Sequence, residues 1–333
     1  MGTAGAAGLT GVDVVTIGET MVMLVPAEPV PLADAATLAV HAGGAESNVA
    51  VYLVELGHPT RWVSRLGDDP FGDLVLRRLA AAGVDTTAVA RVPGGRTGLY
   101  VKDPGAGRTT VHYYRERSPA AALAPDTLAD PLLAEGRVLH LSGITAALSA
   151  SSRELVRTAV RERPVPGRLV SFDVNYRPGL WPVDEAGPVL AELADASDLV
   201  FVGLDEARTL WGCASPAAVR ELLPHPATVV VTDGAVGASA FGAGGAVFVP
   251  TPAVTVVEPV GAGDAFAAGY LAGALEGRED EARLRFGHLV AAAAMSVPSD
   301  HAALPSRTWL RRRIDLPAQE WARLDLSGQW GAS

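Results

Sequence analysis

The chain has 333 residues, of which 49% are hydrophobic and 6% aromatic, so it can bury a large core and is not a disordered polymer. Its formal net charge of −10 argues against nucleic acid or an anionic membrane as a general partner, and its one cysteine, Cys213, excludes a disulfide within the chain. We therefore expect a soluble protein of the reducing cytoplasm. No stretch is long and apolar enough for a membrane span, and residues 1–11, which lack the basic start of a secretory signal, should form a flexible Gly/Ala tail.

The first third of the chain predicts alternating strands and helices, with one irregular stretch. Apolar runs indicate strands at 12–17 and 61–66, and apolar residues at helical spacing, ended by glycine, indicate helices at 45–56 and 69–82. Residues 21–40 are apolar but contain Pro26, Pro29 and Pro31. Because proline disrupts a strand ladder, we expect exposed or edge strands there rather than core strands.

A hairpin then interrupts the alternation. Residues 97–102 and 109–114 are β-like runs joined by Asp-Pro-Gly-Ala-Gly, a typical turn composition. No helix separates the two runs, so they should not belong to a parallel sheet. We expect them to form a small satellite sheet together with parts of 18–40.

After Pro125 the alternation resumes and defines the fold class. We expect strands at 138–142, 169–173, 199–202 and 228–232, a hairpin of 238–241 and 246–249, and helices at 151–163, 184–194, 204–211, 265–275 and 280–295. Such a pattern predicts an α/β fold with a mostly parallel sheet sandwiched by helices. Sites in these folds lie at the carboxyl ends of strands, so the loops at 43–44, 175–177 and 261–264 should meet in one crevice.

The stretch Gly261-Ala262-Gly263-Asp264 immediately precedes a predicted helix. Small residues there allow backbone N–H groups and the helix dipole to converge on an anion, such as a phosphoryl group in transfer. Asp264 has two interpretations at what we expect to be the N-cap position. It could only cap the helix, or it could act as a general base toward a hydroxyl beside the anion.

Further polar positions are candidates for ligand contacts, each with a structural alternative. Gly43, Gly44 and Asn48 could approach a polyol or simply form a tight turn into a helix. Tyr113 and Arg115 share one face of a strand and could hold a hydroxylated carboxylate, or could be an ordinary exposed strand.

Three strand exits add further candidates. Arg177 could bind a carboxylate or phosphate, or form a loop salt bridge. Gly234, just after Thr232, could let a nucleotide approach closely. Glu206 could organise Mg²⁺ through water, or could cap the helix that begins beside it.

Taken together, these motifs resemble the ribokinase-like (PfkB) sugar kinases over residues 12–306. The resemblance is carried by Gly43-Gly44 with Asn48, by residues 67–72 (GDDPFG) and by Gly261–Asp264. Within that family the chain is most similar to the subfamily that phosphorylates 2-keto-3-deoxygluconate. The residues concerned are 43–50 (GGAESNVA), 97–100 (TGLY), 113–115 (YYR), 140–145 (HLSGIT), 172–177 (FDVNYR) with Trp181, and 258–270 (EPVGAGDAFAAGY).

The resemblance implies a ribokinase-like core at 12–306, a β-sheet lid formed by about 18–40 and 96–116, and a C-terminal extension at 307–333. It implies an enzyme that uses ATP and Mg²⁺, leaves room for a monovalent cation, and phosphorylates the terminal hydroxyl of a sugar acid as a homo-oligomer, at least a dimer. Asp264 would be the base, and the Gly261, Ala262 and Gly263 amides would hold the phosphoryl charge. The implied sugar contacts are Gly43, Gly44, Asn48, Tyr100, Tyr113, Arg115, Arg177 and Asp264, and the implied nucleotide contacts are Thr232, Gly234, Gly237, Gly261 and Gly263.

Two alternative functions remain open, and the chain departs from the family pattern at two positions. A fructokinase or ribokinase of the same family is the nearest alternative, and a non-catalytic sugar sensor on the same fold is another. The chain has Gly203 where the family carries Asn, with Glu206 retained, which affects the expected Mg²⁺ and nucleotide contacts. Asp233 stands where the family carries an apolar or small residue, and nothing in the sequence explains it.

Overall fold

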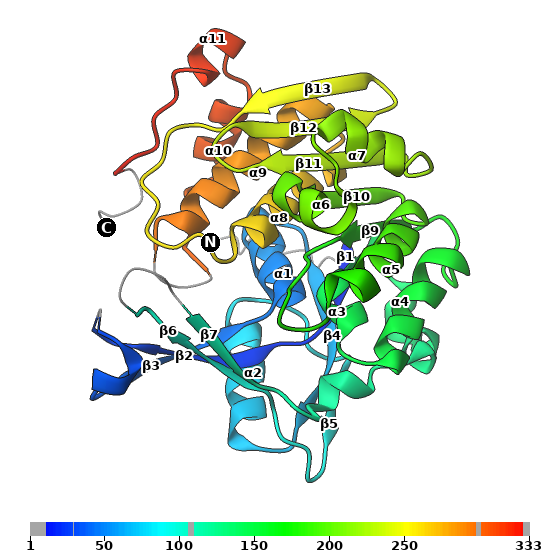
Figure 1. The fold of residues 1–333 in the computed structure, drawn as a ribbon, viewed down its shortest axis with the longest axis vertical. Coiled ribbons are helices and arrows are strands. Elements are labelled where there is room, and N and C mark those ends of the chain that lie inside the picture. Colours follow the sequence, from blue (N-terminus) through cyan, green and yellow to red (C-terminus); the bar gives the residue numbers. More distant parts are fainter. Residues whose placement is uncertain (1–10, 29, 106–109, 298–300, 329–333) are drawn as a thin grey trace, which may run out of the picture.

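The structure is a computed structural model that describes residues 11–28, 30–105, 110–297 and 301–328. Its centre is a nine-stranded sheet with the order β13-β12-β11-β10-β9-β8-β1-β4-β5 (Figure 1). The strands are β1 (Val14–Ile17), β4 (Thr60–Gly67), β5 (Val89–Val92), β8 (Val138–Ser142), β9 (Leu169–Asp173), β10 (Leu199–Gly203), β11 (Thr228–Asp233), β12 (Gly237–Gly242) and β13 (Gly245–Pro250). All neighbours pair in parallel except the β11–β12–β13 meander, which confirms the predicted α/β class.

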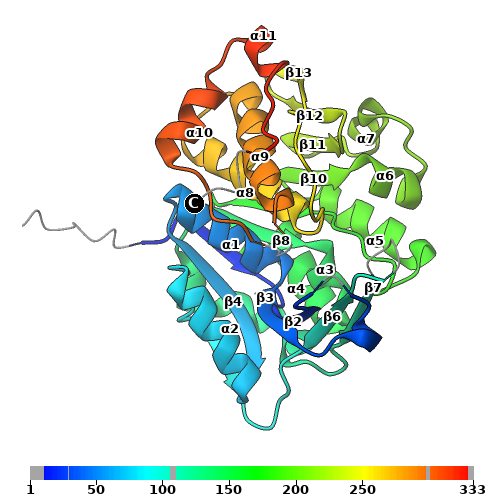
Figure 2. The same cartoon turned by 90° about the vertical axis from the view of Figure 1, so that its left-hand side faces the viewer.

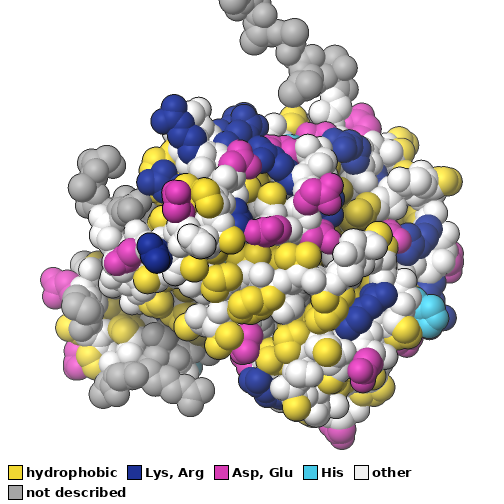
Figure 3. All heavy atoms as spheres, turned by 90° about the horizontal axis from the view of Figure 1, so that it is seen from above, with side chains coloured by type: hydrophobic (Ala, Val, Ile, Leu, Met, Phe, Trp, Pro, Cys, Tyr) yellow, Lys and Arg dark blue, Asp and Glu magenta, His cyan; other side chains and the backbone are white. Residues whose placement is uncertain are grey.

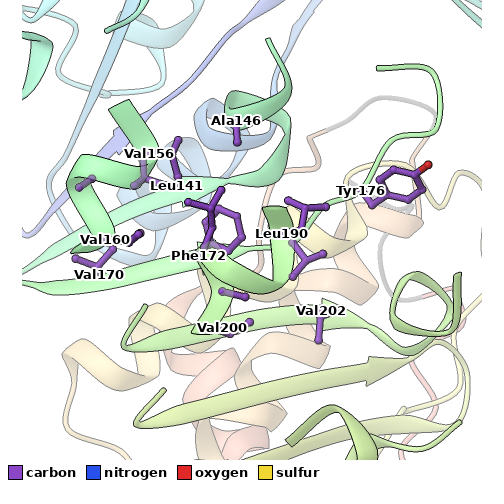
Figure 4. Packing of buried hydrophobic residues seen from close by; sticks show 14 of the residues in the cluster. Leu141, Ala146, Val156, Val160, Val170, Phe172, Tyr176, Leu190, Val200 and Val202 are labelled. Atoms are coloured by element: carbon purple, nitrogen blue, oxygen red, sulfur yellow. The ribbon is translucent and has the colours of Figure 1, made fainter. Parts of the chain in front are cut away.

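Helices cover both faces of this sheet (Figures 1 and 2). One face carries α1 (Ala45–Leu56), α8 (Ala262–Leu275), α9 (Asp280–Met295), α10 (Arg307–Ile314) and α11 (Ala318–Trp321). The other carries α3 (Gly143–Ala147), α4 (Ala150–Arg161), α5 (Val183–Asp195), α6 (Leu204–Trp211) and α7 (Pro216–Leu222). Figure 4 shows this second core, where Phe172 and Val200 of the sheet pack with Val156 and Leu190 of the helices.

Local chemistry sets the helix starts. The remaining long helix, α2 (Pro70–Ala81), begins one residue after the predicted start, because Asp69 is its N-cap. The Asp69 carboxylate accepts the N–H of Gly72 at 2.7 Å, and proline occupies the first helical position. A different feature distinguishes helix α8, which is apolar on every side: all its residues from Asp264 to Gly273 are buried. Such a helix can only be a central element of the core.

The predicted satellite sheet is present, with the order β3-β2-β6-β7. Its strands are β2 (Met21–Pro26), β3 (Leu38–Gly43), β6 (Leu99–Asp103) and β7 (Thr110–Tyr114), and the predicted start of the last strand at Thr109 lies outside the described residues. The expectation of edge strands is wrong for β2, which lies between β3 and β6 with Val22 and Met23 fully buried. Pro26 is the last residue of β2 and Pro31 lies beyond it, so neither breaks its ladder, and Pro29 lies outside the described residues.

Several elements carried too weak a pattern to be predicted. These are β5, α3, α7 and the 3₁₀ segments η1 (Leu32–Asp34), η2 (Pro119–Ala122), η3 (Pro125–Ala129) and η4 (Pro131–Ala134). The C-terminal helices also join the core, since Leu310, Ile314 and Trp321 are buried in the same cluster as α8 and α9.

The surface seen from above mixes charges of both signs (Figure 3). Ion pairs near the C-terminal helices include Arg311 with Glu276 at 2.9 Å and Arg278 with Asp315 at 2.9 Å. Among the described helices, none combines the length and apolar character that crossing a bilayer requires.

Two buried histidines predict a loss of stability in acid. Burial lowers the pKa of His140 and of His288 to about 4, and the neutral rings bond Ser171 Oγ at 3.0 Å and the Val249 carbonyl at 3.2 Å. In the unfolded chain both would titrate near 6.5, so the unfolded state binds more protons between pH 6.5 and 4. The contribution of each neutral histidine to the free energy of unfolding should therefore be fully present above pH 6.5 and be lost as the pH falls toward 4, by about 2–3 kcal/mol per histidine.

The measurement is urea unfolding at pH 7.5 and 4.5 for the wild type and for His288→Gln, whose amide can still donate to Val249. Buried carboxyls such as Glu46, whose pKa is raised by burial, act in the opposite direction in both proteins, so the difference between the two isolates the histidine. We expect the wild type to lose more stability than the variant on acidification. A difference that does not change with pH would contradict the prediction.

Candidate active site

The buried carboxylate of Asp264 lies where α1 and α8 begin, at the carboxyl ends of the central strands. The prediction that Asp264 is the N-cap residue is wrong: the N-cap is Gly261, in the left-handed region with φ 87°, and Asp264 is the third residue of α8. Its carboxylate accepts hydrogen bonds from Asn48 Nδ2 at 2.8 Å and from Asn175 Nδ2 at 3.4 Å. Because no side chain caps this helix, the capping interpretation of Asp264 fails and a positioned carboxylate remains.

Two amides therefore orient the two oxygens of Asp264. We expected Asn48 to bond a polyol, and the structure shows it bonded to Asp264 from one turn inside α1. Asn175 was not predicted as a site residue. It follows β9 with φ 38°, an uncommon conformation for a residue other than glycine, and that conformation is typical of functional loops. The available signal was a polar pair, Asp173 and Asn175, directly after a buried strand.

The start of α8 is open for an anion. Gly261 and Ala262 are half-buried and Gly263 is exposed, and a Cβ built on Gly263 would meet nothing within 4 Å. The N–H of Ala262 bonds the Pro259 carbonyl at 3.3 Å, so the next N–H groups, those of Gly263 and Asp264, are the candidates for binding an anion at the positive end of the helix dipole. This arrangement suits a phosphoryl group next to the Asp264 carboxylate.

A carboxyl cluster lies beside Asp264. Burial raises the pKa of Asp173 well above its usual range, and the carboxylates of Glu206 and Asp264 raise it further, against the charge of Arg177. Burial also raises the pKa of Glu206, whose two oxygens accept the N–H groups of Tyr176 at 2.9 Å and Gly203 at 3.0 Å. Glu206 thus ties the exit of β9 to the start of α6, which is the capping role given as its alternative.

Mg²⁺ fits this cluster only as a largely hydrated ion. Within the residues that the structure describes, no group of three or more His, Cys, Asp or Glu side chains could hold a metal directly. Mg²⁺ commonly keeps several waters and uses one or two carboxylates together with substrate phosphates, so Glu206 is compatible with a water-mediated contact. Residue 203 is Gly where the family carries Asn, and its backbone N–H already donates to the Glu206 carboxylate.

The raised pKa of Asp173 predicts that this residue can be replaced. Burial and the neighbouring carboxylates favour the protonated form of Asp173, and a protonated carboxyl resembles an amide in shape and can donate a hydrogen bond, so Asp173→Asn should keep kcat within about 3-fold of the wild type. Steady-state kinetics at pH 7 provide the check. A loss as large as that expected for Asp264 would show that Asp173 works as a charged group.

The predicted polyol side is formed by the start of α1 and by the small sheet. Gly44 is the N-cap of α1, and a side chain there would clash with the carbonyl of Glu19, so glycine is required for close packing. Gly43 is the last residue of β3. Tyr100 and Tyr113 lie opposite each other on β6 and β7, with ring centroids 5.8 Å apart.

The two predicted arginines have different surroundings. Arg115 forms an ion pair with Glu19, which is 4% exposed, and Ser118 donates to the other oxygen of that carboxylate. Arg177 is exposed and lies close enough to Asp173 for its charge to lower the pKa of that group. Arg115 is therefore already neutralised, whereas Arg177 remains accessible at the mouth of the carboxyl cluster.

Three of the predicted nucleotide positions, Thr232, Gly234 and Gly237, lie where β11 turns into β12. Thr232 pairs with Gly203 across β10 and β11, which places the turn next to the carboxyl cluster in the sheet. Gly234 has φ 49° and no atom within 4 Å of its built Cβ. Packing alone explains glycine at position 237, because a side chain there would clash with the backbone of Val249 on β13.

A separate cavity of about 440 Å³ lies at the opposite, amino-terminal ends of the central strands β8 and β9. It is lined by the starts of β8 and β9, including Arg137 and Arg168, and by the end of α8 at Leu275. It contains none of the predicted site residues.

Comparison with known proteins gives a consistent result. The model of the pfkB family carbohydrate kinases matches residues 12–307. The 2-dehydro-3-deoxygluconokinase of Bacillus subtilis (strain 168) is 33% identical over 302 residues, covering 89% of this chain and 93% of that protein. The protein of the same name from Thermoproteus tenax is 33% identical over 304 residues, covering 89% and 92%. The crystal structure of an uncharacterized sugar kinase from Pyrococcus horikoshii in complex with ATP has a TM-score of 0.78 at 25% identity, covering 90% and 97%.

Proposed function

Because the chain belongs to the pfkB family of carbohydrate kinases, we propose that it transfers the γ-phosphoryl group of ATP to the terminal hydroxyl of 2-keto-3-deoxygluconate, giving 2-keto-3-deoxy-6-phosphogluconate. Membership of the family makes the chain a sugar phosphotransferase, as the sequence motifs predicted. The named relatives support the keto-deoxy acid, which is the same compound as 2-dehydro-3-deoxygluconate.

The observation that carries the proposal is the Asp264 carboxylate, held by two amides at the open start of α8. In the reaction Asp264 takes the proton of the sugar hydroxyl, and Asn48 and Asn175 keep its oxygens aimed at that hydroxyl. The hydroxyl oxygen forms a bond to the γ-phosphorus as the bond to ADP breaks. The Gly261–Asp264 amides carry the negative charge on the phosphoryl oxygens, which is the main task in phosphoryl transfer. Mg²⁺, held through water by Glu206, would neutralise phosphate charge.

The sugar would lie under the small sheet, which we propose to be a lid. Gly43, Gly44, Tyr100 and Tyr113 border this side, and Thr232, Gly234 and Gly237 border the nucleotide side. The resemblance also supports a cytoplasmic homo-oligomer, at least a dimer, and light scattering of the purified protein would measure its mass.

One observation favours a neutral sugar as the second candidate. The charge of Arg115, which we expected to attract a carboxylate, is already balanced by Glu19. A fructokinase or ribokinase activity would need no free cation at that position. The intact Gly261–Asp264 site gives no support to a sugar sensor without catalysis.

The test is a substrate panel with purified protein, ATP and Mg²⁺. We expect the highest kcat/KM for 2-keto-3-deoxygluconate, with the galactose-derived epimer as the main competitor and with fructose and ribose at least about 10-fold lower. A preference for fructose or ribose would replace the proposal by the second candidate. No turnover with any sugar, in a protein that still binds sugar, would favour the sensor.

A further inference from the structure

Lys102 is the only lysine of the chain, which has 27 Lys and Arg residues in total. It lies on β6 of the small sheet and is 1% exposed. A buried lysine is costly unless its ammonium has a partner, and lysine is otherwise among the most exposed residue types. All other Lys and Arg residues of the chain are arginines, so a single lysine that is also buried calls for a specific role.

Strand geometry places Lys102 on the predicted sugar side of the small sheet. Residues two apart on a strand share a face, so Lys102 lies on the face of Tyr100. Directly across the ladder, Lys102 pairs with Val111 and Tyr100 pairs with Tyr113. The ammonium therefore extends from the same face as the two tyrosines proposed to border the sugar.

This ammonium reaches the segment that leads into the anion site. Lys102 Nζ lies 3.8 Å from Glu258 Oε2, and the other carboxylate oxygen of Glu258 accepts the N–H of Val260 at 3.1 Å. The N–H of Ala262 then bonds the carbonyl of Pro259 at 3.3 Å, at the first residue of α8. A continuous set of polar contacts thus joins the small sheet to the turn before Gly261.

We propose that Lys102 is a positioning residue that couples closure of the small sheet over the sugar to the setting of the 258–261 turn that receives the nucleotide phosphates. The inference rests on the proposed function, since it needs a sugar on one side and a nucleotide on the other. Moving β6 away separates Lys102 from Glu258, two charges with little solvent around them, and this is costly. Each ligand therefore favours the conformation that the other one binds, and the coupling is reciprocal.

Lysine suits this position better than arginine would. Its ammonium is a compact charge on a flexible chain and can bind a single carboxylate, whereas a guanidinium presents five donors that need further acceptors. The contact also acts through Glu258, so Lys102 is not itself required to touch the phosphates.

The test measures how much the sugar tightens nucleotide binding. Calorimetry gives the Kd of a non-hydrolysable ATP analogue with Mg²⁺, with and without saturating 2-keto-3-deoxygluconate, for the wild type, Lys102→Met, Glu258→Gln and the double variant. We expect at least about 5-fold tightening in the wild type and less than about 2-fold in each variant, with no further loss in the double variant. Arg91→Met, which breaks a surface ion pair with Asp73 on α2, is the matched control and should keep the wild-type coupling.

A second measurement separates this inference from the identity of the sugar. The nucleotide analogue alone should slow hydrogen exchange in residues 99–103 of the wild type and of Arg91→Met, but not of Lys102→Met. If the wild type fails to bind the sugar and this protection persists, the proposed substrate is wrong and the coupling stands. If Lys102→Met is folded, with a circular dichroism spectrum like that of the wild type, and retains either the tightening or the protection, the inference is overturned.

Discussion

Replacing Asp264 with Asn is expected to lower kcat by about 10²–10⁴-fold while changing sugar affinity little. The substitution keeps the size of the side chain at the start of α8 but removes the group that accepts the hydroxyl proton. The carboxylate is 7% exposed and accepts hydrogen bonds from the amides of Asn48 and Asn175, which hold it in place for the hydroxyl. Steady-state kinetics and a sugar-binding titration at pH 7 measure the two effects separately.

Two further variants make this result interpretable. Asp264→Ala avoids an amide facing two other amides, and it should lose at least as much kcat as Asp264→Asn. Asp173→Asn removes a neighbouring carboxyl whose pKa is raised by burial, and it should remain active. Near-normal turnover by both Asp264 variants would remove the base assignment, and with it the observation on which the proposed function rests.

Replacing Arg177 with Ala is expected to reduce kcat/KM for 2-keto-3-deoxygluconate by about 30-fold or more, because a carboxylate left without its charged partner loses about 2–5 kcal/mol. The chain carries a net charge of −10, so long-range attraction does not favour an acid and a local cation must. Arg177 is exposed at the exit of β9, beside Asp173 and Glu206. A neutral sugar such as fructose should lose less than about 3-fold in the same variant.

Arg115→Ala supplies the contrast. Since Arg115 is paired with the buried Glu19, its removal leaves that carboxylate without its cation and should harm acid and neutral sugars alike. The measurement is kcat/KM for 2-keto-3-deoxygluconate and for fructose in the wild type and in both variants. If Arg177→Ala lowers both sugars equally, or if the wild type prefers fructose, the keto-deoxy acid should be given up in favour of the fructokinase alternative.

The amino-acid sequence by itself determined the architecture and the chemical class. Alternating apolar strands and helices predicted the mostly parallel sheet with helices on both faces, and the hairpin without an intervening helix predicted the separate small sheet. The motifs predicted the family, whereas the anion site at the small residues before α8 stays a prediction. These features could be predicted because each depends on spacing within a short stretch, which sequence patterns report directly.

The tertiary structure alone decided which side chains contact one another at the candidate site. Asn48 and Asp264 are 216 residues apart in the sequence, and Asn175 and Asp264 are 89 apart, so no local pattern could show that the two amides hold the carboxylate. The pairing of Arg115 with Glu19 and the contact of Lys102 with Glu258 likewise cross between distant segments. Which partner a polar side chain finds depends on how strands and helices pack, and packing is a property of the whole chain rather than of any stretch of it.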